Sequence, residues 1–423
     1  MELMTKYQYT YFVYPYTIEE SKFNKYLLKL FKDPRCSIKI FEKEKDLDIY
    51  DFFLPNVRNY MFPTFELRGE ALRDFKDLKK PEQKVKKIAP NHVNTFIYDL
   101  GNNIQGKVGV ENGIFFKIEE IEIITFDTGI CFFTMKTHLE NTNKFFDLLD
   151  FNYRFKNINS EFASLKDFEN IKIQTDTFKD MKDITELISQ ITGITPKDKR
   201  TPVYEEGIVN SQFYTFSYVC IETSNWNEKT NFRDIENDFL RYSNVLPSNY
   251  NSDFNKANLE HNLHIIEKLK YSKTAISNTS SNIFCSGIDT YNYTKLPYEY
   301  ENQYFYLYIL SLYKKLFLLK LSVEFKEYGK IVKLRNKFID FTKLIWNKDV
   351  TLDDTGALYY RIINKTLDLE DLYNEIQNKY EVIYKDLNIE KNNVYYQIIV
   401  ILLIFSLIFN TINILFLMYY FLY

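Results

Sequence analysis

The stretch NNVYYQIIVILLIFSLIFNTINILFLMYYFLY, from Asn392 to Tyr423, contains no Lys, Arg, Asp or Glu and consists mainly of Ile, Leu, Phe and Tyr. A bilayer core of about 30 Å is crossed by about 20 helical residues that rise about 1.5 Å each. The stretch is longer than this, so it predicts one membrane-spanning helix over residues 392–423. We therefore expect a tail-anchored protein that has the lipid bilayer as a partner.

Tyrosines mark both edges of this stretch, where amphipathic rings prefer the headgroup level of the membrane. They are Tyr395 and Tyr396 at one edge and Tyr419, Tyr420 and Tyr423 at the other. An alternative is a pair of short helices that turn at Asn410 to Asn413. The arm after that turn would be only about 15 Å long, too short to return across the bilayer, so one span is favoured.

Three polar side chains interrupt the apolar stretch at helical spacing. Ser406, Asn410 and Asn413 occupy positions i, i+4 and i+7, which lie on one face of a helix. Amides are costly against lipid, so they usually bond to a neighbouring helix or face a cavity. Three interpretations stay open: a pore-lining or interhelical role in an oligomer, a simple dimer seam, or no role.

Charge predicts the orientation of the span. Lys385 and Lys391 precede it and no charged residue follows, so the positive-inside bias places the N-terminal part in the cytoplasm, with the span in the inner (cytoplasmic) membrane. Met1 to Thr17 lacks the pattern of a signal peptide. The four cysteines are far apart, which fits a reduced cytosol and gives no zinc signature.

The residues before the span divide into three predicted parts. An α/β cytoplasmic domain covers 1–170, a second α/β part or an extension of it covers 171–296, and a helical bundle with a stalk covers 297–391. A strand is expected from Tyr7 to Tyr14, ending at Pro15, and Asp127 to Gly129 reads as the turn between two long strands. Strands mixed with helices predict an α+β or α/β fold class.

The third part reads as almost all helix. Asn302 to Tyr328 has a dense aromatic and Leu face, but Lys314 and Lys320 interrupt it, so it predicts a buried helix rather than a second span. Thr351 to Asp354 offers a cap for the last helix. That helix carries an apolar stripe of Leu369, Leu372, Ile376, Tyr380, Ile383 and Leu387.

This stripe has two interpretations. It resembles a coiled-coil seam of a stalk, and a helix that continues unbroken into Val394 would be about 100 Å long. The alternative is a helical bundle that packs on itself.

The order of these parts resembles the CorA family of divalent-cation channels, in particular its divergent CorA-like bacterial members. The segments that carry the resemblance are Tyr304 to Phe325, Phe338 to Trp346 and Ala357 to Asn388. The resemblance implies a funnel-shaped homo-pentamer in which Ser406, Asn410 and Asn413 face the central axis. A divalent cation such as Mg²⁺ or a nucleotide signal would be its ligand.

The chain departs from that family in two ways. It contains no Gly-Met-Asn selectivity motif and has no room for the family's second transmembrane helix, so no selectivity residue is carried over. Divergent CorA-like proteins also occur as membrane effectors beside prokaryotic antiviral systems, where a cytoplasmic domain senses a nucleotide and the membrane part opens. The resemblance therefore extends to a defence effector.

Enzyme chemistry has little support in the sequence. His261 and His264 beside Glu260 would place two imidazoles near a metal on a helix, but a solvated helical face is favoured because no third ligand is evident. Asp127 to Gly129 is favoured as a turn over an aspartic-protease triplet. No P-loop, dinucleotide or nucleophile-elbow motif appears, so we predict no metal site and no enzyme.

The net charge of −3 gives no global field for nucleic acid, and we expect no nucleic-acid partner. The basic run from Lys76 to Lys87 is interpreted as a solvated helix and loop, with contact to anionic lipid or a phosphorylated ligand as the alternative.

Two functions follow. The first is an oligomeric CorA-like membrane channel or effector gated by its cytoplasmic domain, with antiviral defence as one setting. The second is a tail-anchored cytoplasmic scaffold or sensor that binds a partner and uses the span only for localisation.

Overall fold

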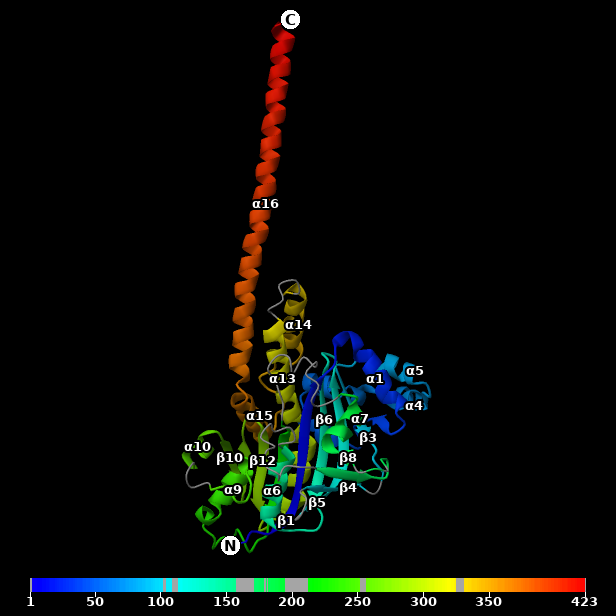
Figure 1. Cartoon of the computed structure of the whole chain (residues 1–423), viewed down its shortest axis with the longest axis vertical. Coiled ribbons are helices and arrows are strands. Elements are labelled where there is room, and N and C mark those ends of the chain that lie inside the picture. Colours follow the sequence, from blue (N-terminus) through cyan, green and yellow to red (C-terminus); the bar gives the residue numbers. More distant parts are fainter. Residues whose placement is uncertain are drawn as a thin grey trace.

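A computed structural model describes residues 2–101, 104–108, 113–156, 171–178, 180, 182–194, 212–251, 256–324 and 331–422, and of residues 331, 384–394, 420 and 422 it describes the backbone alone. Figure 1 shows a body of sheet and helices from which one long helix, α16, projects with the C-terminus at its far end. The predicted mixed α/β class with one C-terminal apolar helix is confirmed.

Within the described residues, twelve strands form one sheet in the order β10-β11-β12-β9-β1-β6-β5-β4-β7-β8, and β3 joins it by pairing with β5 and β2. Neighbouring strands are antiparallel except β9 and β12, which are parallel. The sheet takes strands from both 1–170 and 171–296. The strands are β1 Thr5–Thr17, β2 Cys36–Ile38, β3 Val93–Tyr98, β4 Ile104–Val108, β5 Ile114–Phe126, β6 Ile130–Leu139, β7 Lys172–Thr175, β8 Lys182–Asp183, β9 Tyr214–Ile221, β10 His264–Leu269, β11 Ser272–Ile276 and β12 Ser280–Ser286.

Helices pack on both faces of this sheet and build two separate apolar cores. One core is formed with α2, α3, α13, α15 and the start of α16, and the other with α1, α4 to α7 and α9. The α-helices are α1 Phe23–Lys32, α2 Leu47–Phe52, α3 Pro55–Met61, α4 Gly69–Asp77, α5 Pro81–Ile88, α6 Phe145–Lys156, α7 Ile184–Thr192, α9 Glu236–Ser243, α10 Lys256–His261, α11 Tyr291–Thr294, α12 Leu296–Glu299, α13 Phe305–Glu324, α14 Ile331–Leu344, α15 Asp354–Thr366 and α16 Leu369–Leu422. Short turns of other helix types are η1 Glu20–Lys22, η2 Pro63–Glu66, η4 Phe232–Asp234 and the π-helical η6 Tyr300–Tyr304. The basic run predicted as a solvated helix and loop is confirmed: it covers the end of α4, a loop and α5.

Strand β1 lies in the middle of the sheet and separates the two cores. Tyr9 and Tyr11 belong to the core that contains α13, while Phe12 and Tyr14 belong to the other, as the two-residue period of a strand requires. The predicted end at Pro15 is wrong, because β1 continues to Thr17. Among the described strands, only β6 pairs with β1 beyond its pairing with Tyr214, and proline is tolerated where a strand pairs on one side.

The predicted turn at Asp127 to Gly129 is confirmed as the connection between β5 and β6. Gly129 has a φ of 81°, in the left-handed region that favours glycine. A Cβ atom at this position would also lie 2.0 Å from the carbonyl oxygen of Ile18. The backbone of the turn therefore explains the glycine of this triplet.

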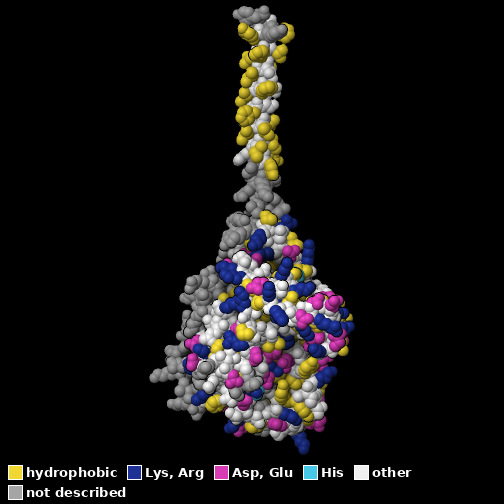
Figure 2. Space-filling model, turned by 90° about the vertical axis from the view of Figure 1, so that its right-hand side faces the viewer, with side chains coloured by type: hydrophobic (Ala, Val, Ile, Leu, Met, Phe, Trp, Pro, Cys, Tyr) yellow, Lys and Arg dark blue, Asp and Glu magenta, His cyan; other side chains and the backbone are white. Residues whose placement is uncertain are grey.

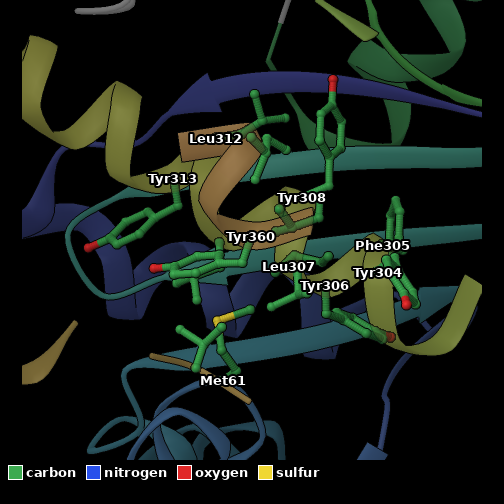
Figure 3. Packing of buried hydrophobic residues seen from close by; sticks show 14 of the residues in the cluster. Met61, Tyr304, Phe305, Tyr306, Leu307, Tyr308, Leu312, Tyr313 and Tyr360 are labelled. Atoms are coloured by element: carbon green, nitrogen blue, oxygen red, sulfur yellow. The ribbon is translucent and has the colours of Figure 1, made fainter. Parts of the chain in front are cut away.

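Helix α13 is the central helix of its core, and the predicted buried helix is confirmed. Most of its 20 residues are buried, including Lys314 and Lys320. Its Tyr313 ring stacks on Phe126 of β5, with centroids 3.8 Å apart and planes 7° apart. Figure 3 shows the side chains of α13 packed together with Met61 and Tyr360. Each fully buried large apolar side chain of this kind contributes about 1.5–3 kcal/mol.

Helices α15 and α16 meet at a corner that the sequence did not predict. The predicted cap is confirmed, because the Asp353 carboxylate accepts a hydrogen bond of 2.6 Å from the Gly356 amide. The helix expected to continue from there is wrong: α15 ends at Thr366, and Asp368 has a φ of 54°. Helix α16 then runs unbroken for 54 residues. Its length of about 81 Å replaces the predicted length of about 100 Å.

Candidate functional site

The apolar segment of α16 stands clear of the body. Among the described helices it is the one candidate span, Tyr395–Tyr419, with 25 residues and none of its apolar window buried. Figure 2 shows hydrophobic side chains over the length of this projecting segment. At about 37 Å it exceeds a bilayer core of about 30 Å. A soluble monomer rarely exposes a patch above roughly 600 Å², so this surface requires lipid or a partner.

One continuous helix runs through this segment. The alternative of two short helices turning at Asn410 to Asn413 is wrong, because α16 passes through these residues without interruption. The rings of Tyr395, Tyr396 and Tyr419 are exposed. Tyr395 and Tyr419 lie about 36 Å apart along the helix, near the two headgroup levels of a bilayer. The Tyr420 side chain lies outside the described residues.

The polar side chains Ser406, Asn410 and Asn413 share one exposed face of α16. The hydroxyl of the neighbouring Thr411 donates to the carbonyl oxygen of Leu407 at 2.8 Å, inside the helix. No such partner is found for the Asn410 and Asn413 amides within the described part of the chain. In a hydrocarbon core these two amides would need a partner from outside this chain.

The apolar stripe at the start of α16 faces the protein's own helices. Leu369 and Ile376 are buried, Leu372, Tyr380 and Ile383 pack against the same core, and the Leu387 side chain lies outside the described residues. Tyr373, also on this side, stacks on Trp346 with centroids 4.2 Å apart. Residues 369–383 are therefore attached to α13 and α14. A seam between copies of α16 stays a prediction.

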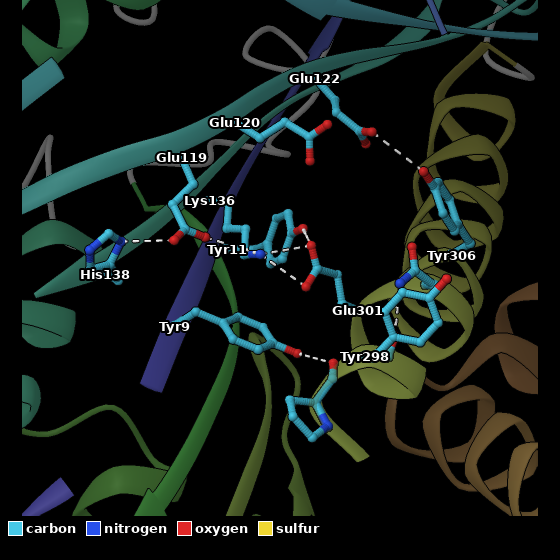
Figure 4. A network of polar contacts seen from close by, with 12 residues as sticks. Tyr9, Tyr11, Glu119, Glu120, Glu122, Lys136, His138, Tyr298, Glu301 and Tyr306 are labelled. Carbon is cyan, nitrogen blue, oxygen red and sulfur yellow. Dashed lines mark hydrogen bonds and ion pairs between the residues drawn. The ribbon is translucent and has the colours of Figure 1, made fainter. Parts of the chain in front are cut away.

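A network of polar contacts attaches the start of α13 to the sheet (Figure 4). The Glu301 carboxylate of η6 accepts hydrogen bonds from the Tyr11 hydroxyl at 2.8 Å and from the Lys136 ammonium at 2.8 Å. The Tyr9 hydroxyl donates to the carbonyl oxygen of Pro297 at 2.8 Å. Strands β1 and β6 are thus connected to the helices that precede α13.

Three closely spaced carboxylates of strand β5 flank this network, at Glu119, Glu120 and Glu122. Lys39 pairs with Glu122 and lies 3.7 Å from Glu120. Burial and the neighbouring Glu122 raise the pKa of Glu120 to about 7. A hydrogen bond from His138 lowers the pKa of Glu119 to about 2. Glu119, Glu120 and Lys136 also line a cavity of about 520 Å³.

The sequence reasoning missed this cluster. Its signal was the run Glu119, Glu120 and Glu122 on a predicted strand, but the cationic partners come from distant parts of the chain. The reasoning also missed the contact between His92 and Asp127, whose Nδ1 and Oδ2 atoms are 2.7 Å apart.

His261 and His264 do not share a helix, so the favoured solvated helical face that carries both of them is wrong, and so is the helix assumed for the alternative metal pair. His261 ends α10 and His264 begins β10, where its Nδ1 atom lies 3.0 Å from the Thr366 hydroxyl. The described residues contain no cluster of three metal-ligating side chains. Both histidines line a cavity of about 1030 Å³ beside the corner of α15 and α16.

Comparison of the chain with protein-family models, curated proteins and solved structures finds no match. No residue therefore receives a role from a relative, and the CorA-like resemblance stays a prediction.

Proposed function

We propose that this protein is a tail-anchored membrane effector whose α16 helices associate in copies of the chain and form a channel. The observation that carries the proposal is a single helix, α16, buried at its start in the folded body and uncovered over its apolar segment. The unpartnered amides of Asn410 and Asn413 lie on that uncovered segment. Each copy of α16 carries the same two amides, so neighbouring copies can form hydrogen bonds with each other through them.

The energetics favour this association. An interhelical hydrogen bond in a membrane contributes about 0.6–2 kcal/mol. In a ring each helix contributes two amides, so the hydrogen bonds between neighbouring helices add up around the ring. Ser406 extends the same polar face. A ring with this face turned inward has a polar lumen, which ions require. By the CorA-like resemblance the ring is a pentamer, with Mg²⁺ or another ion as its cargo.

The proposal places the body in the cytoplasm and the span in the inner membrane. The contacts at the two ends of α13 support a gating role for the body. Its start is attached to the sheet through Glu301, and its surface holds residues 369–383 of α16. A rearrangement in the body would therefore displace α16. In this proposal a nucleotide signal regulates the channel, and antiviral defence is the setting in which the channel acts.

We assign no catalytic reaction. The carboxylates of β5 have a packing explanation, because Lys39, Lys136 and His138 lie in contact with them.

Ion flux through liposomes tests the channel. The double variant Asn410→Leu and Asn413→Leu keeps the span apolar but removes both amides, so we expect flux to fall by at least about tenfold. Thr411→Val is the matched control, because the Thr411 hydroxyl already bonds within its own helix. The proposal fails if the double variant conducts as well as the natural chain.

The second candidate is a tail-anchored scaffold or sensor, which the large body favours because one span is enough for localisation. Replacement of residues 392–423 by an unrelated apolar anchor separates the two candidates. A scaffold keeps its cellular function after this exchange, whereas a channel loses it.

A further inference from the structure

A large cavity lies beside the corner between α15 and α16. It has a volume of about 1030 Å³. Side chains from α13, the segment after α14, α15 and the first turn of α16 line it, together with the two histidines. We call it the corner cleft. A volume of this size suits a small molecule, for which binding pockets span about 300–1,000 Å³.

Lys314 of α13 lies at the buried side of the corner cleft, with 1% of the residue exposed. Its ammonium donates a hydrogen bond to the Tyr360 hydroxyl and lies 5.4 Å from the centre of the Trp346 ring. Among the described residues it forms no ion pair with a carboxylate. Burial accordingly lowers the pKa of Lys314 to about 7. A buried cation without an anion is costly, so an anion that entered the cleft would offset this cost by pairing with the ammonium.

Three more cations line the corner cleft, at Lys348, Arg361 and Lys365, and all three are exposed. No carboxylate of the described ranges pairs with any of them, although lysines elsewhere pair readily, as Lys337 does with Glu20. Three carboxylates also line the corner cleft: Asp368 just before α16, and Glu370 and Asp371 in its first turn. They complement the positive end of that helix, which reduces their repulsion of an anion.

We propose that the corner cleft binds a soluble, polyphosphate-bearing small molecule between α13, α15 and the root of α16. Phosphate oxygens accept paired hydrogen bonds from a guanidinium and strong ones from ammonium groups. Arg361 and Lys365 lie one helical turn apart on α15 and therefore face the same ligand. Lys314 supplies the deeper contact, and Lys348 closes the opposite rim.

The ligand comes from solution rather than from a lipid headgroup. The helix from Leu369 to Tyr395 is about 39 Å long, which separates the corner cleft from the start of the span. Even at a tilt of 40° the separation along the membrane normal is about 30 Å. A headgroup does not extend that far.

The ligand would regulate the span. It contacts residues on both sides of Asp368, so its binding holds α15 and α16 at one angle. This consequence rests on the proposed channel function, whereas the binding itself does not.

The test is calorimetric titration of inorganic tripolyphosphate into the full chain in nanodiscs of zwitterionic lipid. We expect binding, and the double variant Arg361→Gln and Lys365→Gln weakens it by about tenfold or more, because two charge-assisted contacts are lost. Both side chains are exposed, so this variant folds. Lys343→Gln, an exposed α14 lysine outside the corner cleft, is the control and keeps the full affinity. Absence of binding, or equal affinity in the double variant, overturns the site.

Two further experiments test the source of the ligand and its effect on the span. Nanodiscs that contain phosphatidic acid leave the tripolyphosphate affinity unchanged if the ligand is soluble, and weaken it by competition if a lipid headgroup occupies the cleft. Ion flux with and without tripolyphosphate tests regulation. Binding with unchanged flux in a conducting protein overturns the link to α16, whereas a protein that binds but never conducts overturns the proposed channel and leaves the site.

Discussion

Glu120, which is half-buried, and Lys314, which is buried, are ionisable residues whose pKa values both lie near 7, one raised and one lowered. Burial is the first cause in each case, since it disfavours the charged form, and Glu122 adds to the effect at Glu120. The sequence predicted neither, because Lys314 reads as a polar interruption of an apolar helix. Only the packing of α15 over α13 shows that its ammonium lies inside the protein.

Glu120→Gln should stabilise the protein at pH 8 but not at pH 5. The native carboxyl holds its proton up to about pH 7, while the unfolded one loses it near 4.5, so stability falls as pH rises between these values. We expect the melting temperature of the variant to exceed that of the natural chain at pH 8 by about 2 °C or more. Scanning fluorimetry in detergent measures this. The exposed Glu140→Gln is the control, and equal shifts at both pH values would contradict the assignment.

Lys314→Met should have the opposite pH dependence. The pKa of the native amine, about 7, lies below the unfolded value of 10.5, so the native state is penalised at pH 6 and recovers as pH rises. Tyr360 accepts a hydrogen bond from the Lys314 ammonium, and the other titratable groups that line the same cleft are His261, His264, Lys348, Arg361, Lys365, Asp368, Glu370, Asp371 and Tyr373. Methionine removes the penalty, so the gain in melting temperature is larger at pH 6 than at pH 9. Tripolyphosphate affinity falls in the same variant. A larger gain at pH 9 would refute this explanation.

At the scale of elements, the parts with strong local patterns were predictable. The apolar segment, the buried helix α13, the turn at Gly129 and the cap at Asp353 all follow from periodicity, composition or turn chemistry. The end of β1 was not predictable, because the tolerance for Pro15 depends on which strands pair beside it. The sequence around Asp368 contains no Gly or Pro, so the corner between α15 and α16 left no local signal.

Asp368 sets that corner, and its left-handed backbone makes a prediction. Asp368→Gly should be neutral or stabilising, whereas Asp368→Val should lower the free energy of unfolding by about 1–2 kcal/mol, because a β-branched residue is strained at a φ of 54°. Urea unfolding measures both. Asp371→Val, in the regular helix three residues later, is the control. A loss at Asp371 as large as at Asp368 would show that the backbone at the corner is not special.

At the scale of the whole molecule, one sheet and two cores form a body from which α16 leaves as a single helix. The strand order could not be predicted, because β9 reaches the centre of the sheet through pairings with β1 and β12 that lie far apart in sequence. The candidate functional residues also include a part that the sequence predicts and a part that it does not. The polar face of Ser406, Asn410 and Asn413 is readable from spacing, but the corner cleft is not, because its cations come together only when α13 and α15 pack.

Self-association of α16 is the central claim, and the subunit number of the intact protein tests it most directly. Native mass spectrometry of the detergent-solubilised full-length chain measures that number. We expect a closed ring of several copies, five by the CorA-like resemblance, and its dissociation in the Asn410→Leu and Asn413→Leu variant. A natural chain that is monomeric or dimeric would contradict the channel and leave the tail-anchored scaffold.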